Sequence, residues 1–145
     1  MILVDANLLI YAYNPAAGQH AAAKRWLEAV VAGRTPVRFA WVTVLAFVRI
    51  MTHPQVFKRP FSMQEAVEMV DSWLAQPSVA MLGPSDDHWS MLRQLLLNGQ
   101  ASGPLSTDAH LAALAVEHGA TLFTTDRDFA RFPNLQFVNP LELEA

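Results

Sequence analysis

Three aspartates stand where the chain could bring carboxylates together to do chemistry. Asp5 ends the apolar run ILV, and Asp126 ends the run TLFTT. Asp108 lies in the first turn of a helix predicted to begin at Ser106. The C-terminal ends of parallel strands share one edge of a sheet, and crossover helices begin at that same edge. The sequence therefore predicts that Asp5, Asp108 and Asp126 lie at one end of the molecule.

Carboxylates in such positions are also common helix caps, which is the simpler interpretation of Asp108 and Asp126. However, several acids at one edge repel one another and raise each other's pKa unless a cation lies among them. Oxygen ligands without paired histidines suit Mg²⁺, with Mn²⁺ as an alternative, rather than zinc. Such an ion can clamp a phosphate, acidify a bound water and offset charge on a leaving oxygen. The acids thus indicate metal-dependent phosphate chemistry.

The composition narrows the class of protein. At 145 residues and 52% hydrophobic, the chain is expected to form a single domain over residues 1–145 with a sizeable core. A net charge of −3 argues against a broad basic face for nucleic acid. With no cysteine, disulfides, thiolate zinc sites and cysteine nucleophiles are excluded. No apolar stretch is long enough for a membrane span and no basic leader is present, so a cytoplasmic protein without a membrane partner is expected.

The elements that position the acids follow from apolar spacing and turn signals. Strands are predicted over 2–4, 37–41, 79–82, 121–125 and 137–138. Helices are predicted over 8–13, 20–31 and 42–51, from Ser62, from Ser85, and over 106–118. Because strands alternate with helices, the fold class is α/β, a three-layer α/β/α domain with a mainly parallel central sheet.

Two of these helices carry more specific predictions. Ser62 and Glu65 form a capping box, after which Val67, Val70 and Leu74 share the apolar face. On the helix from Ser85, the side chains predicted to face inward are Trp89, Leu92 and Leu96. Core packing is the expected role of the tryptophans, with Trp41 at a strand end.

The chain resembles the PIN-domain ribonucleases, and among them the VapC-type toxins of bacterial toxin–antitoxin pairs. The motifs that carry the resemblance are DANLLIYA near the N-terminus, STDAHLAALAVEHGA near residue 110, and LFTTDRDFARF. The segment WVTVLAFVRIMTHPQVF is similar to one VapC branch, so nearly the whole chain is covered. The resemblance implies a PIN-like nuclease domain and a Mg²⁺-dependent endoribonuclease that hydrolyses RNA phosphodiesters with a metal-activated water. It also implies a VapB-like antitoxin as partner, and a homodimer.

The resemblance also assigns roles to individual residues. It implies that Asp5, Asp108 and Asp126 are catalytic and hold the metal, with Asp128 as a further contributor. Asn7 and Thr125 would orient ligands or water by hydrogen bonding. Arg127 adjoins Asp126 and is predicted to hold RNA phosphate, and Arg131 flanks the same turn.

One departure from the family pattern concerns a glutamate that PIN domains usually carry on the helix after the second strand. The equivalent position here is Ala46 or a neighbour, and no acid occurs between Arg38 and Met51. A complete four-acid site is therefore not expected, which weakens the case for a second bound metal. A catalytically impaired PIN-fold binding module is consequently an alternative. An aspartyl phosphatase using Asp5 is a further one, although Asn7 stands where such enzymes normally place a second acid.

Overall fold

The computed structural model describes residues 1–142, and its strands form one sheet. The strands are β1 (Ile2–Val4), β2 (Val37–Phe39), β3 (Val79–Met81), β4 (Thr121–Phe123) and β5 (Phe137–Val138). All neighbours pair in parallel, in the order β3-β2-β1-β4-β5. The predicted α/β fold with a parallel central sheet is confirmed.

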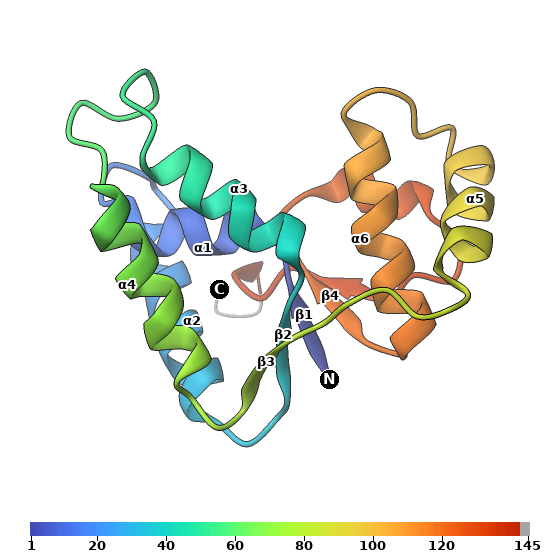
Figure 1. Cartoon of the computed structure of the whole chain (residues 1–145), viewed down its shortest axis with the longest axis horizontal. Helices are drawn as coiled ribbons and strands as arrows, with labels where there is room; N and C mark the ends of the chain where they lie inside the picture. The colour runs from blue at the N-terminus through green and yellow to red at the C-terminus, as the bar shows by residue number, and fades with distance from the viewer. Residues whose placement is uncertain (143–145) are drawn as a thin grey trace.

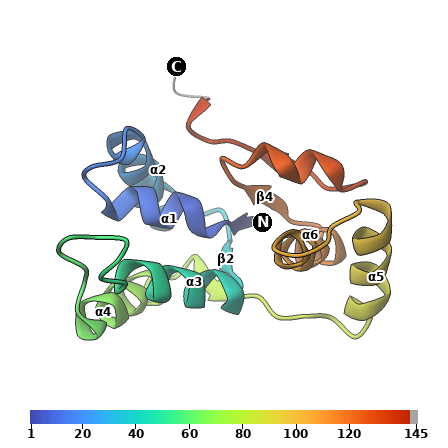
Figure 2. The ribbon, with the colours of Figure 1, turned by 90° about the horizontal axis from the view of Figure 1, so that it is seen from above.

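Helices cover both faces of this sheet. They are α1 (Ala6–Tyr13), α2 (His20–Ala32), α3 (Trp41–Met51), α4 (Met63–Leu74), α5 (His88–Asn98), α6 (Leu105–His118) and the 3₁₀ helix η1 (Arg127–Arg131). Figures 1 and 2 show α1 to α4 on one side of the strands, and α5 and α6 on the other. Successive residues of β1 serve the two cores, Leu3 that of α5 and α6 and Val4 that of α1 to α4. In the described part of the chain, no helix has the length and apolarity to cross a membrane.

The strand order places a topological switch point between β1 and β4. From β1 the chain passes through α1 and α2 to β2 on one side, whereas it enters β4 from α6 on the other side. Open parallel sheets form a crevice at such a point, outside the C-terminal ends of the two strands. Asp5 directly follows β1, and Asp126 comes shortly after β4. The fold therefore presents both acids at the crevice.

Several predicted boundaries differ from the structure by one to three residues, among them the strand predicted over 121–125, which ends at Phe123. Two of the differences have clear local reasons. The strand predicted over 37–41 ends at Phe39, because Ala40 is the N-cap of α3 and Trp41 is its first residue. The helix predicted from Ser85 begins at His88 instead. The Ser85 backbone N–H donates to the Glu117 side chain at 2.9 Å, and the chain thus remains a loop there.

The apolar faces predicted for two helices are partly wrong. The capping box of Ser62 is present, but α4 buries Ala66 and Trp73 while Val67 is 47% exposed. Trp73 has the largest apolar side chain on this helix, so the face that buries it prevails. On α5, Leu92 and Leu96 pack against the core as predicted, whereas Trp89 is 65% exposed.

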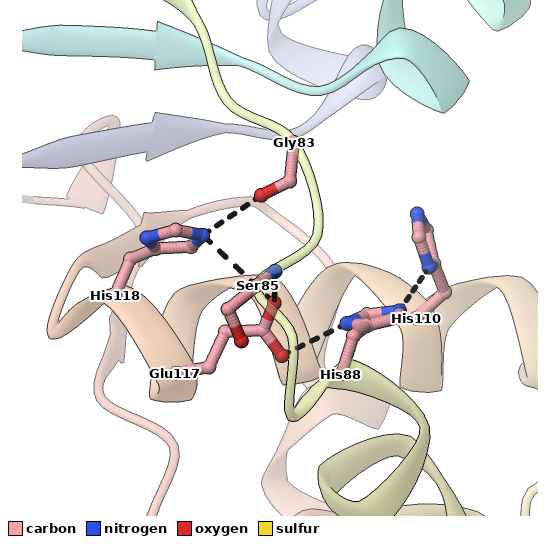
Figure 3. A network of polar contacts seen from close by, with 6 residues as sticks. All are labelled: Gly83, Ser85, His88, His110, Glu117 and His118. Atoms are coloured by element: carbon pink, nitrogen blue, oxygen red, sulfur yellow. Dashed lines mark hydrogen bonds and ion pairs between the residues drawn. The ribbon is translucent and has the colours of Figure 1, made fainter.

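A partly buried polar network around Glu117 joins α5 to α6 (Figure 3). One carboxylate oxygen of Glu117 accepts from the Ser85 N–H, and the other lies 2.8 Å from Nδ1 of His88. Nε2 of His88 in turn lies 2.8 Å from Nδ1 of His110. Since the Glu117 side chain is only 4% exposed, its charge depends on these partners rather than on water. The network thus fixes the start of α5 against the helix that carries Asp108.

Replacing Glu117 with alanine should lower the free energy of unfolding by about 2 kcal/mol, because the Ser85 N–H and the His88 ring lose their partner. Urea denaturation, with an unchanged m-value, measures the effect. Glu142→Ala is the control, since it removes an exposed partner of Arg127 and should cost less than about 0.5 kcal/mol. Equal losses in the two variants would contradict the role given to Glu117.

Candidate active site

Asp5 is fixed between the start of α1 and the neighbouring strand. Its Oδ1 accepts a hydrogen bond of 2.7 Å from the Ala6 N–H and so caps α1. Its Oδ2 accepts a hydrogen bond of 2.7 Å from the hydroxyl of Thr124. The parallel register pairs Val4 with Phe123, which sets the next residues of the two strands side by side. Strand pairing therefore creates this contact.

The hydroxyl of Thr124 is the centre of the hydrogen bonds at this edge. It donates to Asp5 and accepts from the Asp126 N–H at 3.0 Å and from Nδ2 of Asn7 at 3.4 Å. The single proton and both lone pairs of the hydroxyl are thus used. The structure brings Asn7 into the cluster, and the threonine whose hydroxyl contacts Asp5 is Thr124, not Thr125. The predicted roles of Asn7 and Thr125 in orienting ligands or water stay predictions. Alignment of the ILV and TLF runs in parallel register was the signal that could have identified it.

Asp126 both caps a helix and belongs to the acidic edge. Its Oδ1 accepts a hydrogen bond of 2.9 Å from the Asp128 N–H, which caps η1. Asp108 lies in the first turn of α6, and within residues 1–142 its carboxylate accepts no hydrogen bond. The capping interpretation is therefore correct for Asp126, and it does not exclude a role in a site.

The carboxylates act on one another electrostatically. Burial, followed by the charges of Asp5, Asp126 and Asp128, raises the pKa of Asp108 to about 6, while Arg131 acts in the opposite direction. Burial also raises the pKa of Asp5, against the hydrogen bonds from Thr124 and Ala6 and with a smaller contribution from Asp126. Asp5, Asp126 and Asp128 therefore lie closely enough to disfavour the charge of Asp108, and Asp126 also disfavours the charge of Asp5.

This donor set fits a hard divalent cation. Its ligands would be carboxylate oxygens, and a cation would offset the burial and the repulsion that together raise the pKa of Asp108. Among residues 1–142, no three acidic or histidine side chains converge into a ready-made metal-ligand group. The carboxylates thus share one edge without being drawn around one point. Ala46, the position without an acid, lines a cavity of about 150 Å³ together with Asp5 and Asp108.

The two arginines near this edge differ in how they are held. Arg127 is 90% exposed, and its guanidinium lies 3.3 Å from the carboxylate of Glu142. Arg131 donates from Nε to the Asp128 carbonyl at 3.2 Å, and its charge lowers the pKa of Asp108. Arg131 is therefore the cation held beside the carboxylates, and the phosphate contact of Arg127 stays a prediction.

In metal-free protein, Asp108→Asn should raise the melting temperature at pH 7.5. Folding raises the pKa of Asp108 from 3.8 to about 6, so the folded state binds a proton more tightly than the unfolded state does. This preference stabilises the protein fully below pH 3.8, and the stabilisation is lost as the pH rises through 6. The gain at pH 7.5 should be about 1 kcal/mol after allowance for solvent screening, or roughly 3 °C. Thermal melts in EDTA from pH 4 to 8 measure it. A gain that does not shrink toward pH 4 would contradict the electrostatic origin.

Comparison with known proteins identifies the family. The PIN domain family model matches residues 2–135. Ribonuclease VapC37 of Mycobacterium tuberculosis is 41% identical over 140 residues, covering 97% of each chain. Ribonuclease VapC43 of the same species is 38% identical over 142 residues, covering 98% of this chain and 97% of the relative.

Two solved structures show the same fold at low sequence identity. The VapC20 toxin of M. tuberculosis, described as cleaving the sarcin–ricin loop, superposes with a TM-score of 0.67 at 16% identity over 90% of this chain and 93% of its own. DNA-bound VapBC of Salmonella typhimurium superposes with a TM-score of 0.66 at 16% identity over 96% of this chain and 97% of its own. The chain belongs to the PIN-domain family, and within that family to the VapC group.

Proposed function

We propose that this protein is a Mg²⁺-dependent endoribonuclease, with Mn²⁺ as an alternative ion, and the toxin of a type II toxin–antitoxin pair. The observation that carries the proposal is the gathering of Asp5, Asp108 and Asp126 at the switch point between β1 and β4. RNA as the substrate is supported by relatives named ribonucleases at 38% and 41% identity over nearly the whole chain.

Asp5, Asp108 and Asp126 would hold the ion, with Asp128 beside them. When bound, Mg²⁺ supplies positive charge that polarises the phosphate, acidifies a water and offsets charge on the leaving oxygen. The chain keeps Asp5 in place through Thr124 and Ala6. Because the pKa of Asp108 is about 6, its carboxylate is mostly ionised at neutral pH and could bind a cation there. Arg131 adds a fixed positive charge at the rim, suited to an RNA phosphate.

We also propose a VapB-like antitoxin as the regulatory partner and a homodimer as the active assembly. The VapBC complex of similar fold supports the first of these. Co-purification with the product of a neighbouring short reading frame, and light scattering of the toxin alone, test the two statements separately.

The function is tested by incubating the purified protein with structured RNA in Mg²⁺, in Mn²⁺ and in EDTA. Cleavage in the two metals and none in EDTA is the expected result. Release of phosphate from a monoester such as p-nitrophenyl phosphate, without RNA cleavage, would instead favour the aspartyl phosphatase. If neither substrate reacts while RNA still binds, the protein is the impaired binding module.

Thr124→Val should lower RNA cleavage by about 10- to 100-fold, the range typical of residues that orient metal ligands. The change removes the hydrogen bond to Asp5 and leaves the Asp126 N–H and the Asn7 amide without an acceptor. Thr125→Val is the matched control and should stay within about threefold of wild type on the same scale. A larger loss of RNA cleavage in Thr125→Val than in Thr124→Val would show that Thr125 orients the metal ligands, as predicted from the sequence.

A further inference from the structure

Thr43 is a buried polar residue whose hydroxyl is not satisfied by the rest of the described chain. Its side chain is 2% exposed, and its Oγ1 has no hydrogen-bond partner in the described chain. Thr52, near the other end of α3, instead donates to the Val48 carbonyl at 2.7 Å. Thr43 lies in the first turn of α3, where the Ala40 carbonyl three residues before it accepts from the Thr43 and Val44 N–H groups and not from this hydroxyl. Since buried unpaired hydroxyls are unfavourable and uncommon in native proteins, this one needs an explanation.

The cavity beside Thr43 offers one. Its lining brings Thr43 and Ala46 of α3 together with Asp5 and Asp108. A volume of about 150 Å³ is ample for several waters. A buried water needs at least two polar partners, which the two carboxylates can supply. The Thr43 hydroxyl oxygen is fully buried in the described chain, and a change of χ1 rotamer would turn it toward the cavity as a further partner. The cavity therefore adjoins both Thr43 and the acidic edge, at the position that lacks an acid.

We propose that Thr43 is a positioning residue, whose hydroxyl holds a water in the cavity beside Ala46 and so gives the acidic site a neutral oxygen donor for a divalent cation. The inference rests on the proposed function, because it assigns a donor to the same site. A neutral donor adds no charge, whereas a carboxylate at position 46 would add one more to acids that already repel each other. The chain would thus complete a cation site with less negative charge, and bind the ion less tightly than with a fourth acid.

The test is Mn²⁺ binding to the full-length, metal-free protein, followed by the electron paramagnetic resonance signal of free Mn²⁺. Thr43→Val should raise the Kd about tenfold, as expected for an outer contact of a metal site. Its free energy of unfolding without metal should fall by no more than about 1 kcal/mol, because the change removes only the hydrogen bond between the hydroxyl and the water. Thr52→Val makes the same chemical change at the other end of α3 and should leave the Kd unchanged.

Ala46→Glu gives a second, independent readout. A carboxylate there should fill the cavity, displace the water and tighten Mn²⁺ binding about tenfold, and Thr43→Val should then have no further effect on the Kd. Equal Kd values for wild type and Thr43→Val would overturn the inference, as would an undiminished effect of Thr43→Val in the Ala46→Glu background.

The Asp5→Asn variant distinguishes a wrong role for Thr43 from a wrong metal site in the proposed function. If wild type binds Mn²⁺ and Asp5→Asn does not, the acidic site holds the ion, and the Thr43 result judges the inference alone. If wild type binds no Mn²⁺, or Asp5→Asn binds it as well as wild type, the proposed metal site is wrong and the role of Thr43 falls with it.

Discussion

Asp5→Asn should lower RNA cleavage by about 10³-fold while leaving the fold intact. Asp5 is the carboxylate held most firmly, by the Ala6 N–H on one oxygen and by Thr124 on the other. The substitution removes a negative charge where a cation would bind, and a loss of about 4 kcal/mol of transition-state stabilisation corresponds to three powers of ten. Cleavage of a fluorescent RNA hairpin under single-turnover conditions measures the loss.

The fold should survive this change because two effects oppose each other. An amide oxygen can still accept from the Ala6 N–H, whereas the proton of Thr124 loses its acceptor. Against that loss, the variant removes a charge whose pKa is raised by burial. The melting temperature without metal should therefore be equal or higher. Asp86→Asn, an exposed loop acid, should change neither property, and a similar loss of cleavage in Asp86→Asn would show that total charge matters rather than the site.

The acidic edge could be predicted because it depends on topology alone. Apolar runs that end in Asp5 and near Asp126, with a helix beginning before Asp108, suffice to place all three once the sheet is parallel. Thr124 was missed because its role depends on register, and a shift of one residue exchanges it with Thr125. Unused hydroxyls such as that of Thr43 depend on packing around a single atom, which no sequence pattern reports.

The inward faces of α4 and α5 were harder to predict from the sequence than the positions of the strands. Strand positions follow from short apolar runs bounded by turns, and every predicted strand is present, some shortened at one end. Apolar side chains cover a broad arc of both α4 and α5, so spacing alone allows more than one inward face. Burial of Trp73 decides the face of α4, and the network around Glu117 shifts the start of α5, leaving Trp89 outside. Both outcomes come from long-range contacts.

Trp73→Ala should destabilise the protein by about 3–5 kcal/mol, or roughly 10 °C in melting temperature. Trp73 is 3% exposed, and its ring lies 4.7 Å from that of Phe47 and 5.3 Å from that of Phe39, centroid to centroid. Its Nε1 also donates to the Tyr13 hydroxyl at 2.9 Å. The substitution would leave a large void among aromatic rings and an unpaired hydroxyl, and both effects lower the free energy of unfolding measured in urea.

Trp89→Ala provides the matched comparison, because it makes the same substitution on a tryptophan that is 65% exposed. Its effect should stay within about 0.5 kcal/mol, as for most surface positions. A similar loss in both variants would mean that α5 buries Trp89 in solution and that the inward face expected from spacing is correct after all. A small loss of stability in Trp73→Ala would show instead that α4 turns a different face to the core. The two tryptophan variants together therefore test the orientation of both helices.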